Sequence, residues 1–295
     1  MSEFRLSQRV QVNPHVIRST GNKVSNRNLK ARQMLGKYRI RRRVGAGAFA
    51  TVYEAYDTIE GIRVALKVPH RELLGKHSLA EIHREVRLTA RLEHENILPL
   101  RNAMMIDDYF IIATPLGQQT LTDRLRYRLG PATALSYAEQ LIDALAYAHE
   151  KRIIHCDIKP CNVIIFDGHE LRLADFGIAK VAMKTRTIAG SGQGTVGYIA
   201  PEQAMGKPSF RSDVFSLGLV MVRMFSGHLP EWPFDWPPQG ADRLRRTLSR
   251  DFVDFLRRSI EVRERKRFRD GVQMQKAFQR LAPKALRGRN GRGAA

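Results

Sequence analysis

Three short stretches near the middle of the chain carry polar side chains at spacings that suit chemistry at a phosphate. Asp157, Lys159 and Asn162 lie at offsets of 0, 2 and 5 residues, and Asp175 follows Asn162 after thirteen residues. Glu202 comes 27 residues after Asp175. One carboxylate can accept a hydroxyl proton, while a second carboxylate and an amide oxygen can hold magnesium. In this order, the set could move a phosphoryl group from a nucleotide to a hydroxyl.

The motifs around these residues resemble those of a known family. Residues 155–162 read HCDIKPCN, residues 175–177 read DFG and residues 200–202 read APE. With these motifs in this order, the chain resembles a eukaryotic-type serine/threonine protein kinase from about residue 38 to about residue 281. In that family, a lysine two residues after the catalytic-loop aspartate, followed by proline, is the serine/threonine pattern.

The resemblance implies an α+β fold with two lobes. A small antiparallel β-rich N-lobe with one main helix would precede a larger α-helical C-lobe. The resemblance also implies transfer of the γ-phosphoryl group of Mg-ATP to serine and threonine hydroxyls of protein substrates, with autophosphorylation as a further expected reaction. ATP and Mg²⁺ are therefore the expected cofactors, with Mn²⁺ as a substitute metal.

The order of sequence patterns agrees with that fold. Short β-type runs punctuated by glycines extend from Tyr38 to Lys67, and a capping box at Ser78 and Glu81 predicts a helix. After Gly117, apolar residues recur at helical spacing. The predicted organisation is a basic, disordered N-terminal extension (1–36), a kinase domain (37–282, with N-lobe 37–113, hinge 114–117 and C-lobe 118–282) and a basic C-terminal tail (283–295).

Two features near the start of the domain predict a nucleotide site. Gly45 and Gly47 lie between predicted strands, where glycine lets a backbone approach phosphates closely, although a lone G-x-G is usually a plain hairpin. Lys67 closes an apolar strand, and the resemblance implies that it contacts the α- and β-phosphates and pairs with Glu85. The resemblance assigns nucleotide binding to Val44, Gly45, Gly47, Val52, Ala65, Lys67, Glu85, Thr114 (carbonyl), Leu116 (amide) and Ile164.

The catalytic loop would supply the remaining chemistry. By resemblance, Asp157 accepts the proton of the substrate hydroxyl, and Lys159 steadies the γ-phosphate during transfer. Asn162 and Asp175 would hold Mg²⁺ through the oxygen ligands that this ion prefers. An Asp or Asn in a loop is often only a cap or turn residue, but the joint spacing argues against that reading here.

Several other residues are expected to support the site. We expect His155 to pack against Phe176 and not to act as a base. Asp213 is expected to anchor the backbone of the catalytic loop. Glu202 is expected to pair with Arg267 deep in the helical lobe, where removing one partner of a buried pair costs about 3–5 kcal/mol.

Two positions depart from the family pattern. Cys156 replaces the arginine that usually precedes the catalytic aspartate and that binds a phosphate on the activation segment. Phosphorylation at Thr185, Thr187 or Ser191 would therefore lack its usual partner. Thr89 also stands where the family's regulatory spine usually has an apolar residue.

Bulk composition limits the remaining possibilities. The net charge is +21, and residues 1–43 and 283–295 together carry 15 of these charges. Such arms could bind nucleic acid or acidic proteins, and they could equally be solvated tails. No apolar run is long enough to cross a membrane, and the two cysteines both fall in the catalytic loop. A cytoplasmic location is the resulting expectation.

Two other classes of function compete with an active kinase. A pseudokinase scaffold would keep the fold without catalysis, but Lys67, Asp157, Asn162 and Asp175 are all present. A small-molecule phosphotransferase could use a related fold. The segment from residue 194 to residue 202, which receives a peptide in the family, argues against that alternative.

Overall fold

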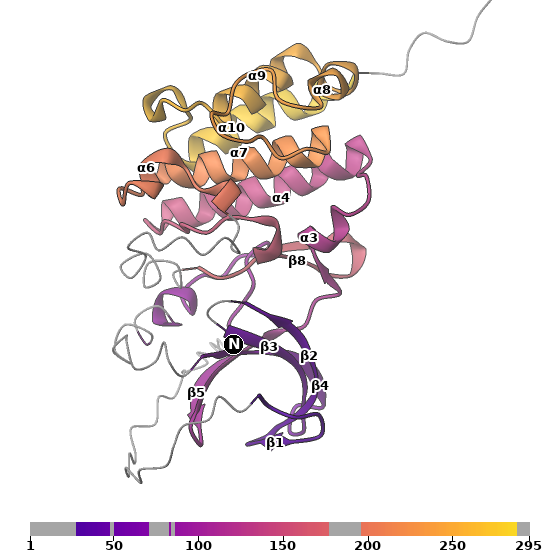
Figure 1. Ribbon diagram of the computed structural model, residues 1–295, viewed down its shortest axis with the longest axis vertical. Helices are drawn as coiled ribbons and strands as arrows, with labels where there is room; N and C mark the ends of the chain where they lie inside the picture. Colours follow the sequence, from indigo (N-terminus) through magenta and orange to yellow (C-terminus); the bar gives the residue numbers. More distant parts are fainter. Residues whose placement is uncertain (1–27, 48–49, 71–82, 84–85, 177–195, 288–295) are drawn as a thin grey trace, which may run out of the picture. The chain divides into compact units, whose positions relative to one another are not determined.

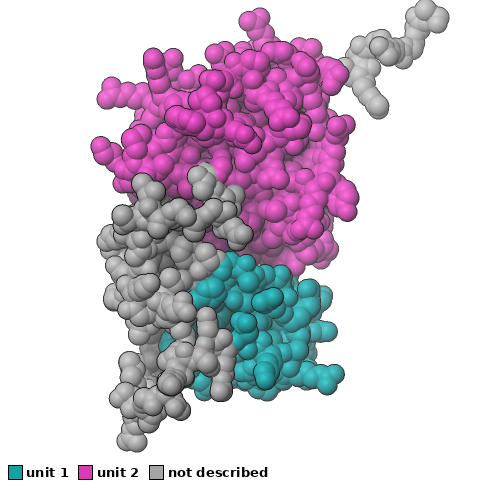
Figure 2. Space-filling view, in the orientation of Figure 1, with its two compact units in different colours: residues 1–79, 100–116 teal, residues 80–99, 117–295 magenta. Residues whose placement is uncertain are grey.

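The chain folds into two compact units. The computed structural model describes residues 28–47, 50–70, 83, 86–176 and 196–287. One unit comprises residues 1–79 and 100–116 and the other residues 80–99 and 117–295, as coloured in Figure 2. Each unit has its own cluster of buried apolar side chains. A β-rich unit and a larger helical unit match the predicted α+β class.

The first unit is a curled antiparallel sheet (Figure 1). Within the described residues its strand order is β1-β2-β3-β4-β6-β5. Gly61 allows the tight turn between β3 and β4, because its φ of +69° lies in the left-handed region. The strands are β1 (Met34–Leu35), β2 (Tyr38–Ala46), β3 (Ala50–Asp57), β4 (Ile62–Pro69), β5 (Asn102–Ile106) and β6 (Tyr109–Pro115).

The N-terminal extension is shorter than the sequence predicts. Leu29 and Leu35 are only 7% and 1% exposed and belong to the core of the first unit. The backbone N–H of Leu29 also donates to the hydroxyl of Tyr53 at 3.2 Å. The prediction of disorder across residues 1–36 is therefore wrong for residues 28–36, while residues 1–27 lie outside the described residues. A two-residue strand is too short to leave a periodic pattern in the sequence.

The second unit contains most of the helices (Figure 1). Helix α7 is its centre, because it packs against α4, α9 and α10 and is buried along most of its length. A second sheet in this unit has the order β7-β8-β9. The helices are α3 (Leu121–Arg124), α4 (Pro131–Glu150), α6 (Pro201–Ala204), α7 (Phe210–Ser226), α8 (Ala241–Thr247), α9 (Arg250–Ser259) and α10 (Gly271–Leu281), and the strands β7 (Gln119–Thr120), β8 (Val163–Ile165) and β9 (Leu171–Leu173).

Short 3-10 helices connect several of these elements: η1 (Pro160–Asn162), η2 (Asp167–His169), η3 (Val196–Tyr198), η4 (Glu264–Lys266) and η5 (Ala282–Lys284). In the part of the chain that the structure describes, no helix combines the length and apolar character needed to span a bilayer.

The second unit includes a segment that precedes part of the first sheet in sequence. Residues 80–99 are assigned to this unit, and the backbone of residues 96–98 pairs with β9. The N–H of Leu98 donates to the carbonyl of Leu173 at 2.9 Å, and the N–H of Leu173 donates to the carbonyl of Asn96 at 2.8 Å. The helix predicted from Ser78 lies largely outside the described residues, although residues 86–89 are helical.

The C-terminal end is also more ordered than predicted. Ala285 is fully buried, and its carbonyl accepts a hydrogen bond from the N–H of Ser249 at 2.7 Å. Arg287 donates through its backbone N–H to Thr247 at 2.9 Å. The prediction of a tail over residues 283–295 is therefore wrong for residues 283–287. Residues 288–295 lie outside the described residues.

Candidate active site

A buried carboxylate organises the segment that carries the catalytic candidates. Asp213, in the first turn of α7, is fully buried. Its Oδ2 accepts the backbone N–H of His155 at 2.7 Å, and its Oδ1 accepts the N–H of Cys156 at 2.8 Å. The ring Nε2 of His149 also lies 3.0 Å from Oδ2. The prediction that Asp213 anchors the catalytic loop is confirmed.

His149 is a supporting residue that no sequence motif singled out. Its Nδ1 accepts the backbone N–H of Gly271 at 2.8 Å, so its Nε2 carries the proton that is donated to Asp213. Gly271 comes very close to α4, because a Cβ at this position would lie 2.8 Å from the backbone of Leu145 and Ala146. The chain therefore fixes Asp213 through a histidine from α4 and the start of α10.

Cys156 occupies an unusual backbone conformation. Its φ is +65°, which a residue with a side chain adopts only where the surroundings impose it. Its N–H is held by Asp213, and its carbonyl accepts a hydrogen bond from Gln203 Nε2 at 2.6 Å. The side chain is buried. Gln203 follows the predicted APE motif directly and was not selected from the sequence.

The two carboxylate oxygens of Asp157 have different surroundings. Oδ2 accepts hydrogen bonds from Lys159 Nζ at 2.8 Å and from Asn162 Nδ2 at 2.9 Å. Asn162 Nδ2 also donates to the backbone carbonyl of Asp157 at 2.8 Å. Among the described residues, nothing donates to Oδ1. The structure thus brings three predicted residues together and leaves one oxygen of the carboxylate open.

Asp175 and Phe176 lie directly beside this loop. The N–H of Ala174 donates to the carbonyl of Asn162 at 2.8 Å, which joins the strand before Asp175 to the end of the catalytic loop. Asp175 has a φ of +65°, so like Cys156 it lies in the left-handed region. Such conformations cost about 1–3 kcal/mol and cluster at functional sites. Asp175 and Asn162 are therefore close enough in the chain fold to serve one site.

His155 has the packing role that the sequence predicts. Its ring centroid lies 4.5 Å from that of Phe176. Its Nδ1 accepts the N–H of Asp157 at 3.2 Å, while its Nε2 lies 2.9 Å from the carbonyl of Ala174. A carbonyl can only accept, so Nε2 carries the proton and the ring has no free nitrogen to act as a base. The prediction for His155 is confirmed.

Thr89 explains one departure from the family pattern. Its hydroxyl donates to the backbone carbonyl of Phe176 at 3.0 Å. An apolar residue at this position could only pack against the phenylalanine. Threonine adds a polar contact to the segment that carries Asp175.

The predicted nucleotide residues of the first unit share one face of its sheet. Gly45 pairs with Val52, Val52 with Lys67, and Ala65 with Thr114 across neighbouring strands. Directly paired residues point to the same face of a sheet. Val52, Ala65, Lys67 and Thr114 are all half-buried, whereas the alternate residues of β3 and β4 fill the core.

The remaining nucleotide candidates are placed as follows. Val44 is exposed on β2, and the N–H of Gly47 donates to the carbonyl of Ala50 at 2.9 Å where the β2–β3 hairpin closes. Leu116 follows β6 and is half-buried. Glu85 lies outside the described residues, so its pairing with Lys67 stays a prediction.

Ile164 belongs to the second unit, where it is half-buried on β8. It pairs with Thr120 of β7 and with Arg172 of β9. Gly117 passes so close to it that a Cβ there would lie 2.2 Å from Ile164 Cγ2. Glycine is required at residue 117 by this approach, which a sequence pattern alone does not reveal.

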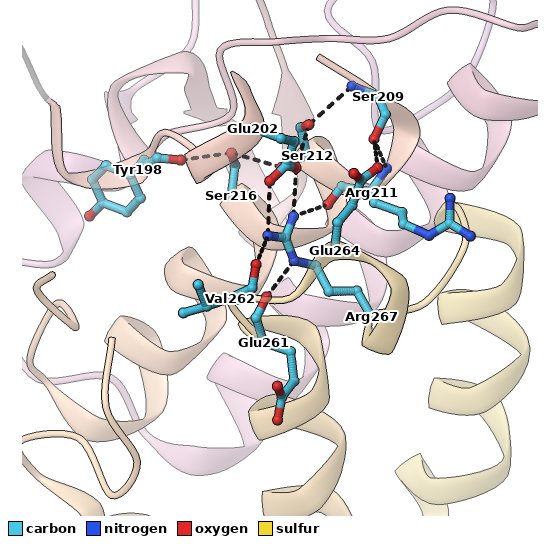
Figure 3. Close-up of polar contacts among 10 residues, drawn as sticks. All are labelled: Tyr198, Glu202, Ser209, Arg211, Ser212, Ser216, Glu261, Val262, Glu264 and Arg267. Carbon is cyan, nitrogen blue, oxygen red and sulfur yellow. Dashed lines mark hydrogen bonds and ion pairs between the residues drawn. The ribbon is translucent and has the colours of Figure 1, made fainter. Parts of the chain in front are cut away.

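An ion pair fixes the end of the predicted peptide-binding segment (Figure 3). Arg267 Nη1 lies 2.7 Å from Glu202 Oε1, and Nη2 lies 3.0 Å from Oε2. The arginine side chain is fully buried and also donates to the carbonyls of Arg211, Val262 and Glu261. Ser212 Oγ donates to Glu202 Oε1 at 2.6 Å. The predicted Glu202–Arg267 pair is confirmed.

Comparison with known proteins agrees with this geometry. A model of the protein kinase domain family matches residues 38–279. The chain belongs to the protein kinase family. Serine/threonine-protein kinase PrkC of Bacillus subtilis is 33% identical over 208 residues, which cover 68% of this chain and 32% of PrkC. Serine/threonine-protein kinase pkn2 of Myxococcus xanthus is 35% identical over 239 residues, covering 73% of this chain and 28% of pkn2.

Solved structures confirm the kinase fold. The Mycobacterium tuberculosis PknI kinase domain superimposes with a TM-score of 0.67 at 24% identity. The match covers 86% of this chain and all of that domain. The kinase chain spans less than half the length of the curated relatives that it matches.

The Glu202–Arg267 pair makes stability depend on pH. Burial alone would raise the pKa of Glu202, but the hydrogen bonds from Arg267 and Ser212 outweigh it and hold the pKa below its ordinary value. The unfolded chain therefore takes up the proton more readily. The stabilisation from Glu202 is complete at neutral pH and is lost as the pH falls below about 4.5.

We predict that Glu202→Gln lowers the free energy of unfolding by about 3–5 kcal/mol at pH 7. The difference from the unmodified chain should shrink as the pH falls from about 5 toward 3. Urea denaturation across this range measures both effects. The control is Glu231→Gln, at an exposed glutamate. A variant with unchanged stability at pH 7 would contradict the structural role of the pair.

Proposed function

We propose that this chain is a serine/threonine protein kinase domain that transfers the γ-phosphoryl group of Mg-ATP to hydroxyls of protein substrates, including its own. The observation that carries the proposal is the arrangement at Asp157. Its Oδ2 is held by Lys159 and Asn162, while its Oδ1 receives no hydrogen bond from the described residues. An oriented carboxylate with one open oxygen suits the acceptance of a hydroxyl proton.

The donor set fits a magnesium nucleotide. Asn162 uses its Nδ2 for Asp157. Among the described residues, its side-chain oxygen accepts only from the weak donor Cys161 Sγ, at 3.7 Å. That amide oxygen and the carboxylate of Asp175 are the hard ligands that Mg²⁺ prefers. Within the described ranges, no three His, Cys, Asp or Glu side chains cluster in a metal-binding arrangement. The proposed site needs only one carboxylate and one amide.

The residues of the loop have distinct roles in this proposal. Asp157 Oδ1 orients the acceptor hydroxyl and takes its proton as the oxygen attacks. Lys159 Nζ, which lies 2.8 Å from Asp157 Oδ2, supplies positive charge next to the position of attack. Bound Mg-ATP would supply the phosphoryl group, with ADP as the leaving group, and the metal ion would neutralise negative charge on the phosphate oxygens. Lys67, on the half-buried face of the first sheet, is proposed to hold the nucleotide phosphates.

A scaffold without catalysis is the competing function. It would retain the fold and the Asp213 anchor but would not need an open oxygen on Asp157. We propose the cytoplasm as the location, because both cysteines of the chain, Cys156 and Cys161, fall in the catalytic loop, where a structural disulfide is not expected.

The decisive test is transfer from radiolabelled ATP to a threonine peptide in Mg²⁺. Asp157→Asn should lower kcat by about 10²- to 10⁴-fold, the usual contribution of a general base. Asp175→Ala should abolish transfer. The matched control is Asp254→Asn, an exposed aspartate on α9. Equal activity of Asp157→Asn and the unmodified chain would remove Asp157 from the mechanism, and no activity in any form would favour the scaffold.

Activity should not depend on phosphorylation of the activation segment in the usual way. Cys156 is buried and uncharged, and it cannot form the bidentate contact of an arginine with phosphate. Thr185 and Thr187 lie outside the described residues. We predict that Thr185→Ala with Thr187→Ala, or treatment with a phosphatase, changes kcat by less than about twofold. A loss of tenfold or more would show that another cation binds the phosphate.

We also propose that the basic termini bind nucleic acid or acidic proteins and are not needed for catalysis. Much of the charge near the N-terminus lies on β2 itself, where Arg39, Arg41, Arg42 and Arg43 are exposed. A chain of residues 28–287 should phosphorylate a peptide as well as the full chain does. It should bind RNA more weakly at low salt, because fewer phosphate charges are neutralised. Equal RNA binding by both chains would show that the termini do not bind RNA and are only solvated tails.

A further inference from the structure

A basic cavity in the second unit has no part in the chemistry described so far. It has a volume of about 200 Å³ and lies between the segment after α3, the end of α7 and α8. The side chains of Arg126, Arg128, Arg223, Arg243 and His228 contribute to its lining. Its lining residues contain no Asp or Glu. A concentration of guanidinium groups around one hollow is costly unless an anion neutralises it.

Most of this charge lacks an acidic partner. Within the described part of the chain, Arg126 alone of these side chains forms an ion pair, with Asp123 at 3.1 Å. Arg223 Nη1 donates to the hydroxyl of Tyr198 at 2.7 Å, and Arg243 Nη2 donates to the carbonyl of Leu129 at 2.8 Å. These acceptors are neutral. Within the described residues, Arg128, Arg223 and Arg243 form no ion pair.

The electrostatic environment of Arg243 is unfavourable, in agreement with the lack of acidic partners among the described residues. Burial, followed by the neighbouring Arg128 guanidinium, lowers the pKa of Arg243 below its ordinary value. Gly227 at the end of α7 lies against the same group, since a Cβ there would be 3.4 Å from Arg243 Nη1. An anion in the cavity would offset the repulsion between the guanidinium groups of Arg128 and Arg243.

The cavity adjoins the segment proposed to receive the substrate. Tyr198, the partner of Arg223, ends the 3-10 helix that precedes the APE motif. Through this hydrogen bond, Arg223 connects the cavity to the segment that precedes the APE motif.

A second contact joins the same two regions. A Cβ at Gly197 would lie 2.8 Å from the side chain of Leu229, the residue that follows His228. The turn after α7 therefore packs against the backbone next to Tyr198.

We propose that this cavity binds a carboxylate or phosphate group carried by the acceptor protein at a position flanking the phosphorylated residue. The proposal rests on the proposed kinase function and specifies its substrate class. The cavity is smaller than the roughly 300–1,000 Å³ typical of sites for drug-sized ligands, so it suits one side-chain head group. Guanidinium groups bind carboxylate and phosphate oxygens in paired, charge-assisted hydrogen bonds.

Binding can be measured without catalysis. Fluorescent peptides with alanine at the acceptor position carry aspartate or phosphoserine at each flanking position in turn, in a neutral frame. Fluorescence anisotropy with the full chain reports their affinity. At one position the anion should tighten binding by about 10- to 100-fold, which corresponds to charged hydrogen bonds of about 1.5–3 kcal/mol. A larger gain for phosphoserine than for aspartate would assign the cavity to phosphate, and an equal gain would assign it to carboxylate.

Variants test whether the cavity is responsible. Arg128→Gln combined with Arg243→Gln should remove the gain in affinity that the anion gives. Arg128→Gln alone should reduce this gain. Arg128 is exposed, so its substitution should not disturb the fold. The matched control is Arg246→Gln, an exposed arginine of α8 that does not line the cavity. Unchanged affinity for the neutral peptide would show that each variant is folded.

The proposal would be overturned if an anion at no flanking position tightened peptide binding, or if Arg246→Gln lost the gain in affinity as fully as the cavity variants. It would also be overturned if the binding of an RNA oligonucleotide required Arg128 and Arg243 while the binding of the peptides did not. Failure of the kinase function is distinguishable from these. In that case the unmodified chain would transfer no phosphate, while the anisotropy would still decide whether the cavity binds the anion.

Discussion

The buried carboxylate of Asp213 is the constraint on which the site depends. It receives two backbone N–H groups from the catalytic loop and the ring proton of His149, so all of its bonds serve to fix other groups. A buried carboxylate without such donors would be strongly destabilising. The loop conformation and the burial of this charge therefore require each other. The positive φ of Cys156 is tolerated because both of its backbone polar groups are held.

A series of contacts connects this anchor to the residues proposed to carry out the chemistry. The loop holds Asp157 and Asn162, and the backbone of Asn162 holds Ala174 just before Asp175. The ring of Phe176 then packs against the His155 ring, and its backbone carbonyl accepts a hydrogen bond from the Thr89 hydroxyl. Residues from four separate stretches of sequence are in this way restricted to one small region. Electrostatic catalysis depends on such fixed positions, because groups that must reorganise lose part of their effect.

The sequence predicted the contacts that belong to motifs and missed those that depend on distant packing. The fold class, the His155–Phe176 contact, the Asp213 anchor and the Glu202–Arg267 pair were all expected from the resemblance of the motifs to those of the kinase family. Leu29 was assigned to a disordered extension and Ala285 to a basic tail, because one or two buried residues in a short segment leave no periodic signal. His149 and Gly117 also escaped notice, since their roles are set by the backbone of a segment far along the chain.

The Glu202–Arg267 pair has a consequence for the order in which the protein is made. The two residues are 65 positions apart, and Arg267 is the later one. While a ribosome is still adding residues between them, Glu202 has already been synthesised without its cation, and the helices that bury the pair are incomplete. The ion pair that holds Glu202 can form only after nearly the whole domain has emerged. Translation itself therefore delays the appearance of a finished site until the end of the domain is present.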